Sequence, residues 1–227
     1  MRGYGQFCPV AKAAEVFAER WTPLVIREMI AGSRRFSDIQ RGVPLMSSSL
    51  LSRRLRDLEQ AGIIERVQRN GPRSTEYVLT EAGRELQPVV ELLGVWGQRW
   101  ATHNLVRDDL DASLLLWDIR RGLDGDRMPE GRTVIHFAFS DGPAPKRNWW
   151  LVANDGDVDL CLTDPGHDVD LHVHSDVRTL VDVWMGHAAI GDALRAGDIA
   201  LDGPRTLVRA FPQWLRLNVF AEHARPA

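Results

Sequence analysis

Residues 36–77 read FSDIQRGVPLMSSSLLSRRLRDLEQAGIIERVQRNGPRSTEY, and the rest of the chain is organised around this stretch. A short helix at 37–41, a turn through 42–46 and a second helix at 47–60 come in the order of a helix-turn-helix. This order predicts a second helix that rests on a core and presents one face outward.

The second helix has two chemically different faces. Leu51, Leu55 and Leu58 recur at steps of four and three residues, so one face is apolar. We expect the leucines to face a core and the remaining positions to face solvent. Those positions carry hydroxyl and guanidinium groups, from Ser48, Ser49, Ser52, Arg53 and Arg56.

A hairpin is predicted directly after this helix. Gly62 ends the helix, and residues 63–68 and 75–79 are rich in residues typical of strands. Between them lies the turn-rich tip RNGPRS at 69–74, which carries two arginines and no acidic residue. The hairpin would extend the helix-turn-helix as a wing.

This arrangement suits double-stranded DNA. Small serines let a helix backbone approach the major groove, and arginines contact phosphates or a guanine edge. From spacing alone, the alternative is an ordinary solvated helix beside a surface hairpin. The predicted DNA-binding residues, which include a basic loop before the first helix, are Arg34, Arg35, Ser37, Ser47, Ser48, Ser49, Ser52, Arg53, Arg56, Arg69 and Arg73.

Several short motifs follow one another in the first half of the chain. They are CPV at 8–10, Trp21, RFSDI at 35–39, LSRRLRDLE at 51–59, AGIIER at 61–66 and YVLTEAG at 77–83. In this order they resemble the HxlR-type winged helix-turn-helix transcriptional regulators. The resemblance implies a non-enzymatic regulator, such as a repressor, that binds operator DNA as a homodimer.

Charge divides the 227 residues unevenly. Residues 1–103 carry 15 Lys and Arg against 11 Asp and Glu, a net charge of +4. Residues 104–227 carry 13 against 20, a net charge of −7. Positive charge therefore collects where DNA would bind. We expect a DNA-binding and dimerisation domain at 1–103 and a separate domain at 112–227.

Other classes of function find little support in the sequence. It has no run of about 18 apolar residues that would span a membrane, and its start lacks the apolar core of a signal peptide, so a cytoplasmic protein is expected. Phosphate-binding loops and the motifs of metalloproteases and serine hydrolases are missing, so no catalytic residue and no cofactor is predicted.

No metal site is predicted either. Cys8 and Cys161 lie far apart and form no C-x-x-C motif. His172 and His174 share one face of a predicted strand and would reach a metal only with His136 or His167. Solvated or core histidines are the expected alternative.

A helix at 80–102 is expected after the hairpin, with Thr80 as its cap and a bend at Pro88. Its apolar positions alternate at steps of three and four residues, as in a short heptad seam. We expect this seam to pack on the N-terminal helix, predicted at 9–19, of a second subunit; packing within its own chain is the alternative. The predicted dimer-interface residues are Val10, Phe17, Leu86, Val89, Leu93, Trp96 and Trp100.

Cys8 is a candidate redox switch. It directly precedes Pro9, a residue typical of a first helical turn, and a helix N-terminus favours the thiolate form. Some members of the HxlR family sense oxidants or electrophiles through a cysteine near the N-terminus. The alternative is a small residue packed at a dimer seam.

The second half predicts an α+β fold in which helices cover one face of a sheet. The expected strands lie at 133–139, 148–153, 158–163, 170–174 and 199–201, and the expected helices at 113–123, 177–185, 190–196, 204–211 and 213–220.

The stretches WWLV at 149–152, DVDLC at 157–161, DLHV at 170–173, WMG at 184–186 and ALRAGDIALDG at 193–203 carry a second resemblance. Over residues 112–220 the chain resembles the sterol carrier protein type 2 family, an α+β fold that encloses an apolar tunnel. This likeness implies an apolar small-molecule effector, with plain core packing as the alternative for each residue. The predicted ligand-binding residues are Leu180, Trp184, Ile190, Leu194, Phe211 and Trp214.

Three functional hypotheses follow. The first is a dimeric transcriptional regulator that an apolar effector modulates through the second domain. The second is a redox- or electrophile-responsive regulator switched through Cys8. The third is a lipid-binding protein whose winged head no longer binds DNA, and the basic groups of the second helix and hairpin weigh against it.

Overall fold

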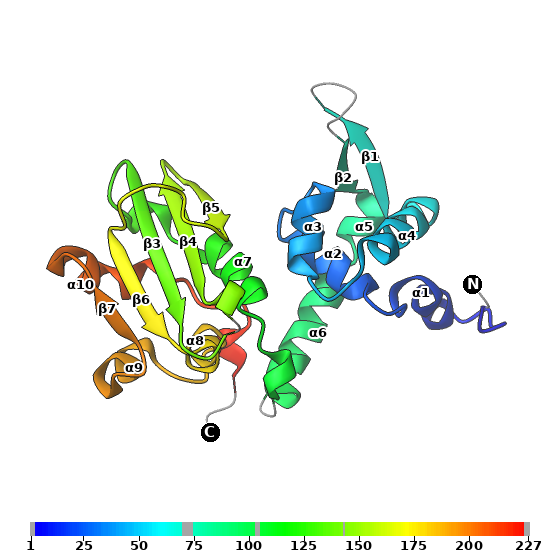
Figure 1. Ribbon diagram of the computed structural model, residues 1–227. Coiled ribbons are helices and arrows are strands. Elements are labelled where there is room, and N and C mark those ends of the chain that lie inside the picture. The colour runs from blue at the N-terminus through cyan, green and yellow to red at the C-terminus, as the bar shows by residue number, and fades with distance from the viewer. Residues whose placement is uncertain (1–2, 70–74, 103–104, 143, 225–227) are drawn as a thin grey trace. The chain divides into compact units, whose positions relative to one another are not determined.

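The computed structural model describes residues 3–69, 75–102, 105–142 and 144–224. The chain forms two compact units, Met1–Gly94 and Val95–Ala227 (Figure 1). The predicted tip of the hairpin falls almost wholly outside the described residues, and Arg73 lies there with it.

The first unit is mostly helical and contains the predicted helix-turn-helix and hairpin. The strands β1 and β2 are antiparallel, with Val67 opposite Glu76. The elements are α1 (Pro9–Phe17), α2 (Thr22–Ile30), α3 (Phe36–Gly42), α4 (Ser48–Gln60), β1 (Ile64–Gln68), β2 (Thr75–Leu79), α5 (Glu81–Arg84) and α6 (Gln87–Trp100), whose last residues belong to the second unit.

The expectation of one helix at 80–102 is wrong, because the helix is interrupted between α5 and α6. Thr80 does cap the first piece, since its Oγ1 accepts a hydrogen bond from the Gly83 N–H at 3.2 Å. Pro88 carries no N–H and restricts the residue before it, so it is accommodated in the first turn of a new helix. The result is two helices where a single bent one was predicted.

The core of the first unit forms where α2, α3 and α4 meet. Ile26, Ile39 and Leu51 are fully buried there, so the apolar faces of the three helices point at one another. The complete set of buried apolar residues is Val25, Ile26, Met29, Ile39, Val43, Met46, Leu51, Leu55, Leu58, Ile64 and Val90.

The second unit contains a five-stranded sheet in the order β5-β4-β3-β6-β7 (Figure 1). The central pair β3 and β6 is parallel, and every other neighbouring pair is antiparallel. The elements are α7 (Ala112–Gly122), β3 (Arg132–Phe139), β4 (Asn148–Asn154), β5 (Asp157–Cys161), β6 (Leu171–Ser175), α8 (Val177–Trp184), α9 (Ile190–Ala196), β7 (Ala200–Asp202) and α10 (Arg205–Trp214).

Alternate residues of the central strands enter one core with the helices. Ile135 and Phe137 of β3 are fully buried, and so is Leu151 of β4. The helices contribute Leu116 from α7 and Leu180 from α8 to the same cluster, and α10 adds Phe211 and Trp214. Packing of the helices against one face of the sheet gives the predicted α+β unit.

The predicted helix at 213–220 does not form. The helix α10 runs through Pro212 and ends at Trp214, and Leu215 then forms an antiparallel bridge with Leu123. In this bridge the Arg216 N–H donates to the Gly122 carbonyl at 2.9 Å. Backbone groups committed to a bridge cannot continue a helix, so the chain leaves the helical path there.

The other face of the sheet carries a cluster of imidazoles. His136 on β3 stacks on Trp150 with 4.9 Å between ring centroids, and its Nδ1 lies 3.0 Å from His172 Nδ1. Its Nε2 lies 3.0 Å from Asn148 Oδ1, an acceptor, so Nε2 donates in this pair. His174, next to His172 on the same strand face, completes the row.

Replacing His136 with Gln should flatten the dependence of stability on pH. Burial lowers the pKa of His136 below its ordinary value of 6.5; Asn148 and Asp164 oppose this shift, whereas His172 and His174 add to it. The folded state therefore favours the neutral ring. The resulting stability is present above the unfolded pKa of about 6.5 and is lost as the pH falls through the folded pKa.

Urea-unfolding midpoints between about pH 7.5 and about pH 5 measure this effect. The wild-type midpoint should fall more than that of His136→Gln. His167→Gln, which removes an exposed imidazole, serves as the control. Equal falls in the wild type and in His136→Gln would contradict the assignment.

Candidate nucleic-acid interface

Helix α4 presents the face that sequence periodicity predicted. Leu51, Leu55 and Leu58 are at most 1% exposed, whereas Arg53 and Arg56 lie in solvent. The exposed polar residues at its start and along its outer side are Ser47, Ser48, Ser49, Ser52, Arg53 and Arg56. Six of the predicted DNA-binding residues are therefore gathered on one surface.

The serines at the start of α4 also hold the helix together. Ser47 is the N-cap, and its Oγ accepts a hydrogen bond from the Leu50 N–H at 3.3 Å. Ser52 Oγ donates to the Ser48 carbonyl at 2.9 Å. The small side chains thus stay close to the backbone, which leaves the helix start narrow enough to approach a groove.

The basic loop before α3 lies next to the hairpin. Arg34 and Arg35 are exposed, and the Arg34 carbonyl accepts a hydrogen bond from the Tyr77 N–H at 2.7 Å. Ser37, also exposed, donates from Oγ to Asp38 Oδ1 at 3.3 Å. The bond to Tyr77 fixes the loop against β2, so its two arginines and the hairpin belong to one surface.

Arg69, the one tip arginine among the described residues, lies near an acidic side chain. Arg69 is 60% exposed, but its Nε lies 3.7 Å from Glu76 Oε2 on the paired strand. By contrast, Arg53 and Arg56 have no ion-pair partner among the described residues. The positive charges of Arg53 and Arg56 on α4 are therefore not neutralised in the way that the charge of Arg69 is.

The turn between α3 and α4 depends on Gln40, which the sequence analysis did not single out. Its Nε2 donates to the Met46 carbonyl at 2.6 Å and to the Val43 carbonyl at 3.3 Å. The amide thereby closes the turn and sets where α4 begins. A glutamine before an apolar turn is a weak signal, because the partners are backbone groups invisible in the sequence.

A buried carboxylate, Glu28, holds the other side of this motif. It is fully buried, lies 2.5 Å from Arg27 Nη2 and accepts a hydrogen bond from Ser33 Oγ at 3.2 Å. Arg27 also donates to the Gly42 carbonyl at 3.2 Å. A Cβ at Gly42 would lie 1.8 Å from the Glu28 carboxyl carbon, so a larger residue at this position would require the buried Glu28 side chain to move.

The predicted dimer residues divide into two groups. Phe17 and Leu86 are partly buried against the core of the first unit. The others are exposed: Val10 at 76%, Val89 at 41%, Leu93 at 49%, Trp96 at 61% and Trp100 at 49%. Leu92, which was not predicted, is 70% exposed beside them. Helix α6 thus carries an exposed apolar stripe.

Cys8 lies where the sequence placed it, at the N-cap of α1 and directly before Pro9. Its thiol is free and half-buried. Phe7 and Val10, on either side of it, are exposed apolar residues.

The six predicted ligand-binding residues belong to the core of the second unit. Leu180, Phe211 and Trp214 are fully buried, Trp184 is 7% exposed, and Ile190 and Leu194 pack against the same cluster. The core-packing alternative describes these contacts. Their close packing against the sheet leaves their apolar faces in contact with other side chains.

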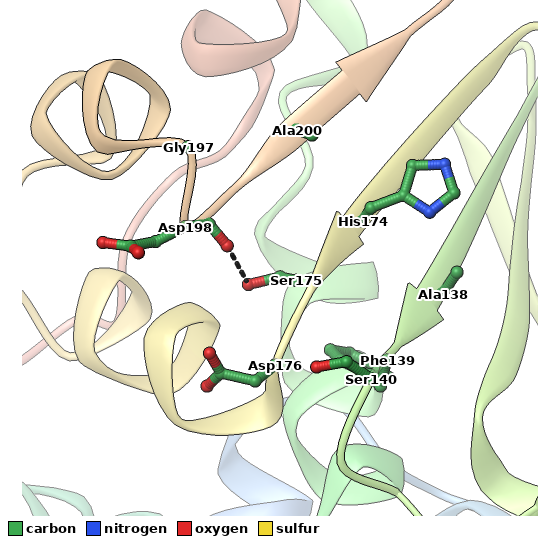
Figure 2. A pocket seen from close by; sticks show the side chains of 9 residues that line it. All are labelled: Ala138, Phe139, Ser140, His174, Ser175, Asp176, Gly197, Asp198 and Ala200. Carbon is green, nitrogen blue, oxygen red and sulfur yellow. Dashed lines mark hydrogen bonds between the residues drawn. The ribbon is translucent and has the colours of Figure 1, made fainter.

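A depression of about 450 Å³ opens elsewhere, at the carboxyl ends of β3 and β6 (Figure 2). Its walls include Ser140, His174, Asp176 and Asp198, and Ser175 Oγ donates to the Asp198 carbonyl at 3.2 Å. The Asp176 carboxylate also caps α8 by accepting from the Thr179 N–H at 2.7 Å. These walls expose polar and apolar atoms in similar amounts, whereas an apolar effector is expected to meet a mainly apolar lining.

The described part of the chain holds neither a cluster of metal-ligating side chains nor a membrane-spanning helix. There, no group of three or more His, Cys, Asp or Glu side chains is arranged to hold a metal ion. Over the same residues, no helix is both long and apolar enough to cross a membrane.

Comparison with protein families identifies the first unit. The model of the HxlR-like helix-turn-helix family matches residues 16–105. The second unit lies almost wholly beyond this match, so its likeness to sterol carrier proteins stays a prediction.

The similar proteins are named as regulators. YvaP of Bacillus subtilis, an uncharacterised HTH-type transcriptional regulator, is 35% identical over 97 residues, which are 42% of this chain and 90% of YvaP. An HTH-type regulator of Methanothermobacter thermautotrophicus is 36% identical over 97 residues, 74% of its length and 42% of this chain. Among solved structures, the redox regulator HypR in its reduced form is 35% identical, covers 40% of this chain and 90% of its own, and has a TM-score of 0.38.

Replacing Ser47 with Ala should destabilise the first unit by about 1 kcal/mol, because the Leu50 N–H loses its acceptor. Ser47→Asp keeps an N-cap acceptor and should retain most of that stability. Urea unfolding followed by far-ultraviolet circular dichroism measures both changes.

Ser48→Ala removes an exposed hydroxyl from the same turn and should change the free energy of unfolding by no more than about 0.5 kcal/mol. Equal losses in Ser47→Ala and Ser48→Ala would argue against the capping role of Ser47.

Proposed function

The chain belongs to the HxlR-like helix-turn-helix family, and we propose that it binds operator DNA as a homodimer through α4, the loop before α3 and the β1–β2 hairpin. It is a DNA-binding regulator of transcription. In the proposed complex α4 enters the major groove, and the hairpin follows the phosphate backbone.

The outward face of α4 carries this proposal. It combines exposed Arg53 and Arg56, whose charges no described acid neutralises, with small serines at the helix start. Phosphate contacts by such arginines supply affinity, and groups at the helix start reach base edges. The neighbouring Arg34 and Arg35 extend the positive surface along the backbone of the DNA.

A homodimer is supported by the exposed apolar stripe on α6. Leu92, Leu93 and Trp96 are each about half exposed or more, and exposed aromatic residues are typical of protein interfaces. The exposed Val10 on α1 offers a second apolar surface for the partner subunit. Two copies would also supply two reading helices for two half-sites.

Two ways of regulating this activity remain predictions. An apolar effector in the second unit would have to displace core side chains such as Leu180 and Phe211. A redox response through Cys8 has a free, half-buried thiol at the start of α1 as its structural basis. Of the two, Cys8 has the more accessible group.

Arg53→Gln or Arg56→Gln should weaken operator binding and its salt dependence together. Each lost phosphate contact should reduce the slope of log K against log salt concentration by about 0.9. Fluorescence anisotropy, with an operator obtained by selection from random DNA, measures both quantities.

Arg209→Gln makes the same charge change at an exposed position of α10 and should leave both quantities unchanged. Wild-type protein that selects no DNA sequence, with Arg53→Gln behaving alike, would overturn the proposal and favour a head that does not bind DNA.

Leu93→Glu or Trp96→Glu should dissociate the homodimer. Losing even about 1.4 kcal/mol of apolar burial raises the dimer dissociation constant about tenfold, and a buried charge adds to this. Sedimentation velocity at several protein concentrations measures the shift, and operator affinity should fall with it.

Val219→Glu places the same charge on an apolar residue that is 80% exposed and lies outside α6. It should leave the oligomeric state unchanged. A dimer that persists in both α6 variants would place the interface elsewhere.

A further inference from the structure

One of the three arginines of α4 points inward. Arg53 and Arg56 are exposed, but the Arg54 side chain is only 8% exposed. Successive helical residues are about 100° apart, so Arg54 falls on the same side as Leu51 and Leu55. Its guanidinium is therefore unable to meet DNA from the outward face.

The Arg54 guanidinium instead contacts residues 19 and 20, in the corner between α1 and α2 that spans residues 18–21. Its Nη2 donates to the Arg20 carbonyl at 3.4 Å and lies 3.5 Å from Glu19 Oε1. Its Nη1 donates to Asp57 Oδ2 at 3.2 Å, one turn further along α4. These contacts connect α4 to residues 34 positions earlier in the chain.

The backbone of this corner has an unusual conformation at one residue. Trp21, at the N-cap of α2, has a φ of 77°, which is uncommon for a residue other than glycine. The Arg20 guanidinium lies over the Trp21 ring at 5.4 Å from its centroid. The corner therefore adopts one defined conformation, which Arg54 holds through the Arg20 carbonyl.

A contribution to folding stability does not by itself explain why an arginine occupies this buried position. Taking a guanidinium out of water costs free energy that its ion pairs only partly offset, and apolar residues of similar volume often pack as well. Within the described part of the chain, Arg54 Nε has no hydrogen-bond partner. A directional contact with one carbonyl, however, fixes how two elements sit against each other.

We propose that Arg54 is a positioning residue for DNA binding, which sets α4 against the α1–α2 corner and thereby couples α1 to the reading helix. This inference rests on the proposed DNA-binding function. Because Cys8 is the N-cap of α1 and this helix carries the exposed Val10, a change at either residue would reach α4 through the contacts of Arg54 with Glu19 and Arg20.

The proposal separates Arg54 from its neighbours by two measurable signs. A charge that Glu19 and Asp57 neutralise contributes no phosphate contact, so its removal should leave the salt slope unchanged. Removing the acid at Glu19 should weaken DNA binding, although electrostatics alone predicts that losing a negative charge strengthens it.

Operator affinity and salt slope should be measured for Arg54→Met, Glu19→Gln and the double variant. Arg54→Met keeps an unbranched apolar stem of similar length, and Glu19 is 43% exposed, so both substitutions suit the fold. We expect each single variant to lose about tenfold in affinity at an unchanged slope, and the double variant to lose no more than Arg54→Met.

The control is Glu65→Gln, which removes an exposed acid from β1 and should leave affinity unchanged or slightly raised. Wild-type affinity in Arg54→Met, a slope reduced by about 0.9, or tighter binding by Glu19→Gln would each overturn the proposal. If Arg54→Met fails to fold, Glu19→Gln decides the matter. If Arg53→Gln lowers operator affinity and salt slope as predicted while Arg54→Met changes neither, this inference alone is rejected and the proposed function stays intact.

Discussion

The burial of Leu51, Leu55 and Leu58 against α2 and α3 is the interaction on which the DNA-binding head depends. A helix with 3.6 residues per turn that buries one face necessarily turns the opposite face to solvent. Burying these leucines therefore places Arg53 and Arg56 outward without any further contact. The same geometry turns Arg54 inward, where it needs partners from elsewhere in the chain.

Polar contacts then fix where this helix starts and how it is oriented. Gln40 closes the turn before α4 through the Met46 carbonyl, and Glu28 holds Arg27 close to Gly42. Hydrophobic burial has little directionality, whereas hydrogen bonds to particular carbonyls do. The leucines therefore supply most of the stabilisation, and the buried polar groups set the position of α4.

The second unit also buries its apolar residues in one core and leaves polar groups outside it. Its helices and sheet bury a dense core that includes Leu180, Phe211 and Trp214, while the imidazoles lie on the other face of the sheet and the depression of Figure 2 has a mixed polar and apolar lining. Large aromatic residues that look suitable for an apolar ligand also make the best core. Sequence alone does not separate the two interpretations, since each requires the same apolar side chains.

The sequence by itself determined the helix-turn-helix, the hairpin and the polar face of α4, because periodicity and turn residues are local signals. It also determined the α+β character of the second half. Tertiary structure alone decided the break before Pro88, the end of α10 at the Leu123–Leu215 bridge and the inclusion of Gln98 of α6 in the second unit, where its Nε2 donates to the Met185 carbonyl at 2.8 Å. It also assigned different roles to Arg53 and Arg54. The reason is that a pattern states which face is buried, whereas the partners that a buried polar group meets lie far away in the chain.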